Sequence, residues 1–233
     1  MATSNASLQS VGSFTVAAWY KVDSASDLTW DIVGKGDPPS YEFGVRNANA
    51  SSLRAYWSTN GTTDTVAINA GDTTLNQWHF GIAWLDSVAG TCNAQLNANA
   101  PVSSSVGTLF VGNGAWSIGA SATGLRPMNG LIGPVGRWSR ALSREESLSL
   151  YNAGRGVSYG TLPPSLLPGL VSWWDLDEPG GTRYDRHGQN HLTPVNDPGS
   201  SNGIVAGPDV DDWSQSASSP LLLRQMLAPG GQS

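Results

Sequence analysis

The chain has 233 residues, a formal net charge of −6 and 13% charged residues. This length suits one large β-domain or two small ones, with a core that needs no disulfides. Negative charge and scattered arginines argue against a nucleic-acid partner, which requires clustered Lys and Arg. The polar start MATSNASLQS predicts neither a signal peptide nor a membrane partner.

The 28 glycines, 14 prolines and ten tryptophans are typical of short strands joined by turns. Alternating apolar and polar residues predict strands at 13–22, 28–35, 41–46, 52–58, 64–69, 77–86, 92–97, 108–112, 116–119 and 130–140. Residues 77–86 give the strongest signal, because Trp78, Phe80, Ile82 and Trp84 share one face. Pro134 removes a ladder donor and favours an edge position or a bulge.

One short helix is predicted near 143–153. Ser143 and Glu146 form the S-x-x-E pattern of a capping box. Gly154 suits the left-handed position that ends a helix. The prolines and glycines of residues 159–169 then indicate an extended linker after a main body at 1–158.

Residues 170–176 form a late strand with large apolar side chains on both faces. Trp173 points to one face, and Trp174 and Leu176 point to the other. That pattern suits a strand covered by two layers. Residues 170–225 are expected to join the main body, and residues 226–233 to form a flexible tail.

Five segments of the chain resemble the laminin-G-like, concanavalin A-like jelly-roll family. They are SFTVAAWYKVDS, VGKGD, YEFGV, NQWHFGIAWLD and NGLIGPVGRWSRALSREESLSLYNAG. The resemblance implies an all-β fold, a two-sheet antiparallel sandwich. It departs at Gly133, where the family carries an acidic residue that often belongs to a structural calcium site. Residues 169–192 resemble the family's first strand and loop, and residues 212–223 its second strand.

The chain therefore carries the pieces of one jelly roll in rotated order. The C-terminal quarter can complete its own sandwich or donate strands to a neighbouring copy, and a truncated second domain is the remaining alternative. The apolar residues Trp173, Trp174 and 221–223 disfavour a truncated second domain. Each large side chain left exposed would lose about 1.5–3 kcal/mol of stabilisation from burial.

Several acidic residues are candidate sites. Asp175 and Asp177 are spaced i, i+2 as a glycosidase pair could be, with Glu178 beside them, but the resemblance places them away from a groove. Asp185 matches a family position beside the first loop, which implies possible structural calcium as the one cofactor. The remaining acidic cluster comprises Asp209, Asp211 and Asp212.

Histidine and aromatic residues give further hypotheses. His187 and His191 are four apart, but Gly188 and Asn190 disfavour a helix and hence a zinc pair. His79 alternates with apolar neighbours and is expected at the surface. A glycan could stack on an exposed ring, and Tyr56, Trp57 and Asn60 are the predicted glycan-binding residues; alternatively, most aromatic residues are core, including Trp30, Tyr41, Trp116 and Trp138.

No frame for a serine nucleophile or a phosphate-binding loop is recognised, so the chain is predicted not to be an enzyme. The resemblance implies recognition of glycans or protein surfaces. A virion-surface role, as a capsid decoration protein of a bacterial virus with protein neighbours and a homo-oligomeric state, is the first hypothesis. A secreted or cell-surface carbohydrate-binding module is the second, and a glycoside hydrolase the third.

Overall fold

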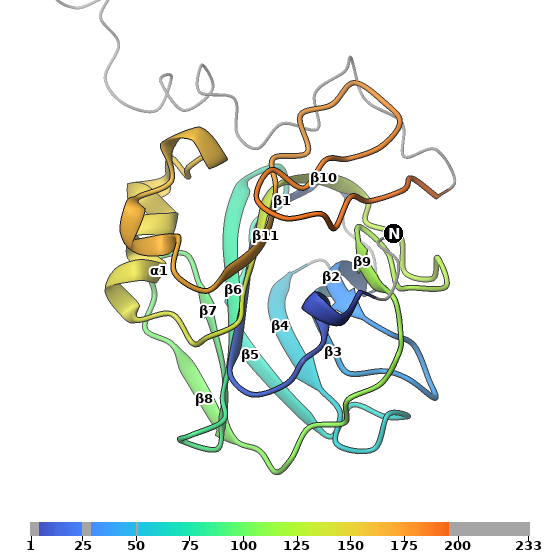
Figure 1. The fold of residues 1–233 in the computed structure, drawn as a ribbon. Helices are drawn as coiled ribbons and strands as arrows, with labels where there is room; N and C mark the ends of the chain where they lie inside the picture. Colours follow the sequence, from blue (N-terminus) through green and yellow to red (C-terminus); the bar gives the residue numbers. More distant parts are fainter. Residues whose placement is uncertain (1–4, 25–28, 50, 196–233) are drawn as a thin grey trace, which may run out of the picture.

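The computed structural model describes residues 5–24, 29–49 and 51–195, which form a two-sheet antiparallel β-sandwich (Figure 1). The six-stranded sheet contains, in spatial order, β11 (Leu170–Trp174), β10 (Gly130–Trp138), β1 (Phe14–Val22), β6 (Trp78–Asp86), β7 (Thr91–Leu96) and β8 (Val102–Ser105). The five-stranded sheet contains β5 (Val66–Asp72), β4 (Ser52–Trp57), β3 (Phe43–Ala48), β2 (Trp30–Lys35) and β9 (Trp116–Ile118). The predicted fold class is confirmed.

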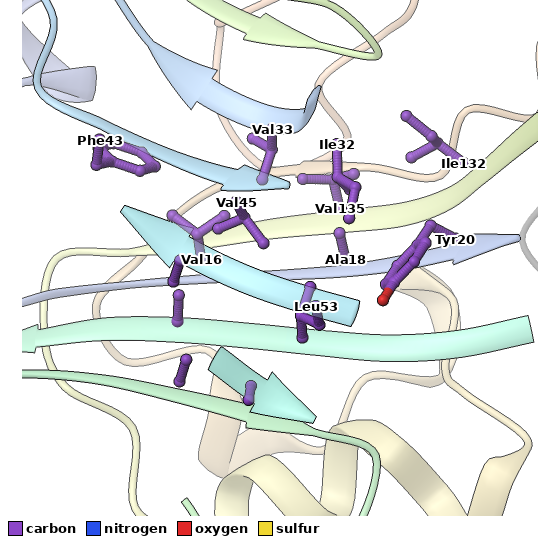
Figure 2. Close-up of a cluster of buried hydrophobic side chains, with 14 of the residues drawn as sticks. Val16, Ala18, Tyr20, Ile32, Val33, Phe43, Val45, Leu53, Ile132 and Val135 are labelled. Carbon is purple, nitrogen blue, oxygen red and sulfur yellow. The ribbon is translucent and has the colours of Figure 1, made fainter. Parts of the chain in front are cut away.

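The main core lies between the two sheets, and alternation along each strand builds it. Figure 2 shows side chains from both sheets meeting there, among them Val16 and Tyr20 of β1 and Val45 of β3. On β4, Leu53, Ala55 and Trp57 share one face and point inward. Their neighbours Arg54 and Tyr56 are directed to the opposite face of the sheet.

A second hydrophobic layer covers the outer face of the six-stranded sheet. Trp19, Phe80 and Ile82 lie on that face and are buried in one cluster with Leu150. Leu150 belongs to helix α1 (Arg144–Tyr151), which lies beside this sheet (Figure 1). The strong apolar pattern of residues 77–86 therefore belongs to this outer layer. The remaining short helical turns are η1 (Ala6–Leu8), η2 (Asn152–Gly154), η3 (Tyr159–Thr161) and η4 (Pro164–Leu166).

The helix begins where the sequence predicts and ends earlier. Ser143 Oγ accepts a hydrogen bond from the Glu146 amide, and the Glu146 carboxylate accepts one from the Ser143 amide, which confirms the capping box. Asn152, with φ of 47°, takes the left-handed terminal position that Gly154 was expected to take. An Asn tolerates this conformation better than most non-glycine residues, so the helix stops about two residues sooner.

The structure corrects one predicted strand and decides between the two positions expected for Pro134. Residues 108–112 form no strand, and the chain pairs instead at β8, Val102–Ser105. β10 is an interior strand, and its pairing with β1 shifts register between Ala18 and Tyr20, opposite Pro134. The proline is thus tolerated at a bulge, because the bulge requires no ladder hydrogen bond from it.

The segment 159–169 is packed, contrary to the expected extended linker. It contains η3 and η4, and Leu162 and Leu166 are buried in the outer hydrophobic layer. The Trp138 indole Nε1 donates a hydrogen bond of 2.7 Å to the Leu166 carbonyl. Apolar residues spaced through the prolines fix this segment against the six-stranded sheet.

Strand β11 pairs with β10 of the same chain. Trp173 packs in the outer layer, whereas Trp174 packs in the main core, so both faces of the strand are buried. Residues 196–225 and 226–233 lie outside the described residues. Whether they complete the sandwich stays a proposal. No helix within the described ranges has the length and apolar character needed to cross a membrane.

A buried ion pair lies at one end of the main core. Lys35 on β2 and Glu42, just before β3, form a salt bridge with both side chains fully buried. Lys35 Nζ also donates to the Gly112 carbonyl at 3.0 Å, and Glu42 accepts from the Gly112 amide at 3.0 Å. The buried Arg137 guanidinium is nearby, and burial lowers its pKa to about 10, with the Glu42 charge opposing that shift.

Candidate functional site

The outer faces of the two sheets differ in character. Apolar residues and α1 cover the outer face of the six-stranded sheet. The outer face of the five-stranded sheet carries charged and aromatic side chains from β2, β3 and β4. In the described part of the chain no hydrophobic cluster covers this second face, which makes it the candidate site.

Alternating arginines and aspartates form a network across this face. Asp31 accepts hydrogen bonds from Arg46 Nε at 2.8 Å and from Arg126 Nε at 3.0 Å. Arg46 Nη1 also contacts Asp64 at 3.0 Å, and Arg126 Nη2 contacts Asp37 at 3.4 Å. Each arginine thus bridges two carboxylates, and the network joins two strands and three loops that are distant in sequence.

Two tyrosine rings enclose the Arg46 guanidinium. Its central carbon lies 4.6 Å from the Tyr56 ring centroid and 5.1 Å from the Tyr41 ring centroid. A Cβ atom at Gly44 would lie 3.1 Å from Arg46 Nε, so the guanidinium is close to the bare backbone of β3. A cation between aromatic faces is attracted by the ring quadrupoles, and this holds Tyr56 in place.

The centre of the network is buried, whereas the side chains beside it are at least partly exposed to solvent. Asp31 and Arg46 are 4% and 8% exposed. Burial raises the pKa of the Asp31 carboxyl above its ordinary value, and the charges and hydrogen bonds of Arg126 and Arg46 partly offset that shift. Tyr56 and Arg54 are partly exposed, and Asn69 of β5 is exposed beside them.

Strand register places the rim residues side by side. Arg54 lies between Arg46 of β3 and Asn69 of β5 in the ladder, and Tyr56 lies two residues further along the same face. We define the rim as Arg54, Tyr56 and Asn69. It offers a ring, a guanidinium and an amide, the groups that stack on and hydrogen-bond to a polar, partly apolar ligand.

The structure separates the three predicted glycan-binding residues. Tyr56 lies on the rim, but Trp57 is 1% exposed in the main core. The Asn60 side chain accepts from the Thr62 and Thr63 amides at 2.9 and 3.0 Å, which caps a turn. Trp116 and Trp138 are also fully buried, and Trp30 and Tyr41 are nearly so, in agreement with the core alternative.

The sequence pattern contained part of the missed signal. Because Leu53, Ala55 and Trp57 share the inward face, Arg54 and Tyr56 must share the outward one. The same alternation places Trp57 on the inward face of β4, so its prediction as a glycan-binding residue is wrong. Arg46 and Arg126 are 80 residues apart in the chain and give no local sign that they share Asp31.

Asp185 organises the loop after β11. Its buried carboxylate accepts hydrogen bonds from the amides of Trp173, His187, Gly188 and Asn190, at 2.9–3.0 Å. Burial alone would raise the pKa of Asp185, but these backbone donors bring it below its ordinary value. Because N–H groups point at both oxygens, the carboxylate serves as a loop cap, which disfavours the calcium role implied by the resemblance.

Replacing Asp185 with Asn is expected to lower the free energy of unfolding at pH 7 by about 2–3 kcal/mol, because hydrogen bonds to a charged acceptor are lost. Its lowered folded-state pKa means the stabilisation is complete above the unfolded pKa of about 3.9 and is lost as pH falls through the folded value. Urea unfolding at pH 7 and at lower pH measures this. A difference between wild type and variant that stays constant as pH falls would contradict the role.

The candidate catalytic carboxylates are held by Arg186. β11 ends at Trp174, and Leu176 has φ of 60°, so Asp175 and Asp177 are not alternate residues of one strand. Asp177 accepts from Arg186 Nη2 at 2.7 Å. Asp175 accepts from the Trp173 indole at 2.7 Å and the Tyr159 amide at 3.0 Å, which gives it a packing role.

The histidines have local partners. His187 contacts the Tyr159 hydroxyl at 3.1 Å, and His191 Nδ1 accepts from the Asp185 amide at 3.1 Å. His79 is 6% exposed and bonded to Thr74, so its predicted surface position is wrong. The described residues bring no three His, Cys, Asp or Glu side chains together as a metal site. Asp209, Asp211 and Asp212 lie outside the described residues.

A separate cavity of about 310 Å³ lies beside β9 and β10. Its apolar wall includes Ile118, Met128, Ile132, Leu176 and Leu192. Val195, the last described residue, also lines it. This cavity is distinct from the rim, since the two share no residues.

The sequence profile of the laminin-G family described as the concanavalin A-like lectin/glucanases superfamily matches residues 1–146. No curated protein matches the chain. Among solved structures, a "putative carbohydrate binding protein" from Bacteroides ovatus is 19% identical with a TM-score of 0.61. That match covers 83% of this chain and 55% of the Bacteroides chain, so this chain spans about half of its length.

Two further structures are more distant. The sialidase CBM40 of Ruminococcus gnavus, bound to alpha2,3 sialyllactose, has 14% identity and a TM-score of 0.49 over 59% of this chain and 81% of its own. A Trypanosoma rangeli sialidase in complex with sialic acid has 16% identity and a TM-score of 0.49 over 61% and 23%. The Bacteroides likeness agrees with the sandwich architecture described above.

Proposed function

Because the chain belongs to the concanavalin A-like lectin/glucanases superfamily, we propose that it is a non-enzymatic carbohydrate-binding module. The ligand would lie on the outer face of the five-stranded sheet, over the rim of Arg54, Tyr56 and Asn69. The observation that carries the proposal is the partly exposed Tyr56 ring, held by Arg46 among polar neighbours. The likeness in fold to the "putative carbohydrate binding protein" of Bacteroides ovatus is consistent with it.

The state of the carboxylates supports binding in preference to hydrolysis. A glycosidase needs one carboxyl group to donate a proton and a second to act as nucleophile or base. On the candidate face Asp31 and Asp64 are both paired with Arg46, and Asp37 is paired with Arg126. These three carboxylates are engaged by arginines within the network, so they do not form a free acid–base pair for a bound sugar.

A glycan array probed with the full chain tests this function. Replacing Tyr56 with Ala is expected to weaken binding to the recognised glycan by about 10- to 30-fold, in line with the truncation of an aromatic hot-spot residue. The Tyr184→Ala variant is the matched control, because Tyr184 is 51% exposed on the loop after β11, away from the rim. Equal binding by wild type and Tyr56→Ala would contradict the site, and no binding to any glycan would contradict the function.

The virion-surface role stays a separate proposal. A capsid decoration protein would contact protein neighbours and could assemble as a homo-oligomer, and the carbohydrate module could then act at a particle surface. Mass spectrometry of purified particles, together with the solution mass of the chain, tests this role. Particles that lack the chain would contradict it.

A further inference from the structure

We propose that the ligand carries one anionic group, a carboxylate or a sulfate on a sugar, and that Arg54 binds it. This inference rests on the proposed function and names the chemical class of the glycan. It follows from the state of the Arg54 side chain and its position between Arg46 and Asn69 on the open face.

Arg54 is an unpaired cation on a face where the other arginines are paired. Its Nε atom is buried and has no hydrogen-bond partner. Within the described ranges, no carboxylate forms an ion pair with it, whereas Arg46 and Arg126 each contact two aspartates. A buried donor left without an acceptor is destabilising, so an acceptor supplied by a ligand would offset that cost.

The strand register places a second positive charge beside Arg54, which favours binding of an anion there. Arg54 lies directly opposite Arg46 on the neighbouring strand, and like charges in that relation are destabilising. Asp31 and Asp64 compensate the charge of Arg46. A guanidinium binds a carboxylate or sulfate through two parallel hydrogen bonds, and this geometry suits Arg54 with the neighbouring Asn69 amide as a further donor.

The charge of the whole chain limits the density of charge on the ligand. With a net charge of −6, the protein repels a polyanion at long range. A single local arginine instead suits a largely neutral saccharide with one acidic sugar. The Tyr56 ring, two residues away on the same face, would contact an apolar sugar face next to the acidic group.

The test is a glycan array in which each saccharide is printed with a terminal uronic acid, with its carboxyl-reduced neutral analogue, and with a sulfated analogue. Wild-type full chain is expected to bind an acidic form about 10- to 100-fold more tightly than the neutral analogue, as for charge-assisted hydrogen bonds. The Arg54→Gln variant is expected to lose this preference, so that it binds the acidic and neutral forms with equal affinity. Arg155→Gln, an exposed arginine after α1 and beside the other sheet, is the matched control and should keep the preference.

The outcomes separate the two proposals. Preference for the uronic acid or for the sulfated form identifies which anion Arg54 binds. Equal binding of acidic and neutral forms, with dependence on Tyr56 retained, overturns the anionic ligand and leaves the proposed function intact. Retention of the acidic preference by Arg54→Gln assigns the anion to another residue and overturns the inference. Absence of binding to all forms overturns both proposals.

Discussion

Replacing Glu42 with Ala is expected to lower the free energy of unfolding by about 3–5 kcal/mol, because it leaves a buried positive charge without its partner. Lys35 would remain fully buried beside the Gly112 carbonyl and the Gln9 amide oxygen, with no carboxylate to neutralise it. Arg137 would also lose the negative charge that opposes the lowering of its pKa. Urea denaturation of wild type and variant measures the difference.

The double variant Lys35→Met, Glu42→Leu separates the loss of a charge partner from the loss of volume. Because apolar residues of similar size can replace a buried ion pair at little cost, the double variant is expected to be more stable than Glu42→Ala. Glu145→Ala, at an exposed helix position, is the surface control and should change stability by less than about 0.5 kcal/mol. A Glu42→Ala variant as stable as Glu145→Ala would show that Glu42 does not stabilise the buried Lys35.

Replacing Trp174 with Ala is expected to cost about 3–5 kcal/mol, the range for large aromatic residues in a core. Trp174 is fully buried and stacks on Trp116 of β9, with ring centroids 5.9 Å apart. Its indole Nε1 donates to the Asn190 carbonyl at 2.8 Å. It therefore joins the edge strand of one sheet to the edge strand of the other and to the loop after β11.

Chemical denaturation with matched variants checks this role of Trp174. Trp174→Phe keeps a ring but loses the indole donor, so an intermediate loss is expected. Tyr184→Ala removes an exposed ring from the neighbouring loop and should change stability little. A cost below about 1 kcal/mol for Trp174→Ala would mean that β11 is dispensable for the sandwich.

The strands were predictable because their alternation is local. Residues such as Leu53, Ala55 and Trp57 show the inward face of β4 without any knowledge of its partners. The Ser143–Glu146 capping box and the bulge at Pro134 likewise depend on only a few neighbouring residues. The two-sided apolar strand at 170–174 was recognised for the same reason.

The packed segment 159–169 and the Asp31 network were not predictable in the same way. Prolines suggested an extended linker, but the burial of Leu162 and Leu166 depends on the outer face of a sheet made elsewhere in the chain. The pairing of Arg46 and Arg126 through Asp31 needs the register of β2 and β3 and the path of a distant loop. Tyr56 was among the predicted residues and lies on the proposed rim. Arg54 was not predicted, because a lone arginine in a strand is usually a solvated side chain.

The location of the ligand is the central claim, and amide chemical-shift mapping by NMR tests it directly. The full chain would be titrated with the saccharide that binds most tightly in the array. We predict that the largest shifts occur on β4 and β5, at Arg54, Tyr56 and Asn69. Shifts confined to the cavity lined by Ile118, Ile132 and Leu192, with β4 and β5 unchanged, would contradict the account.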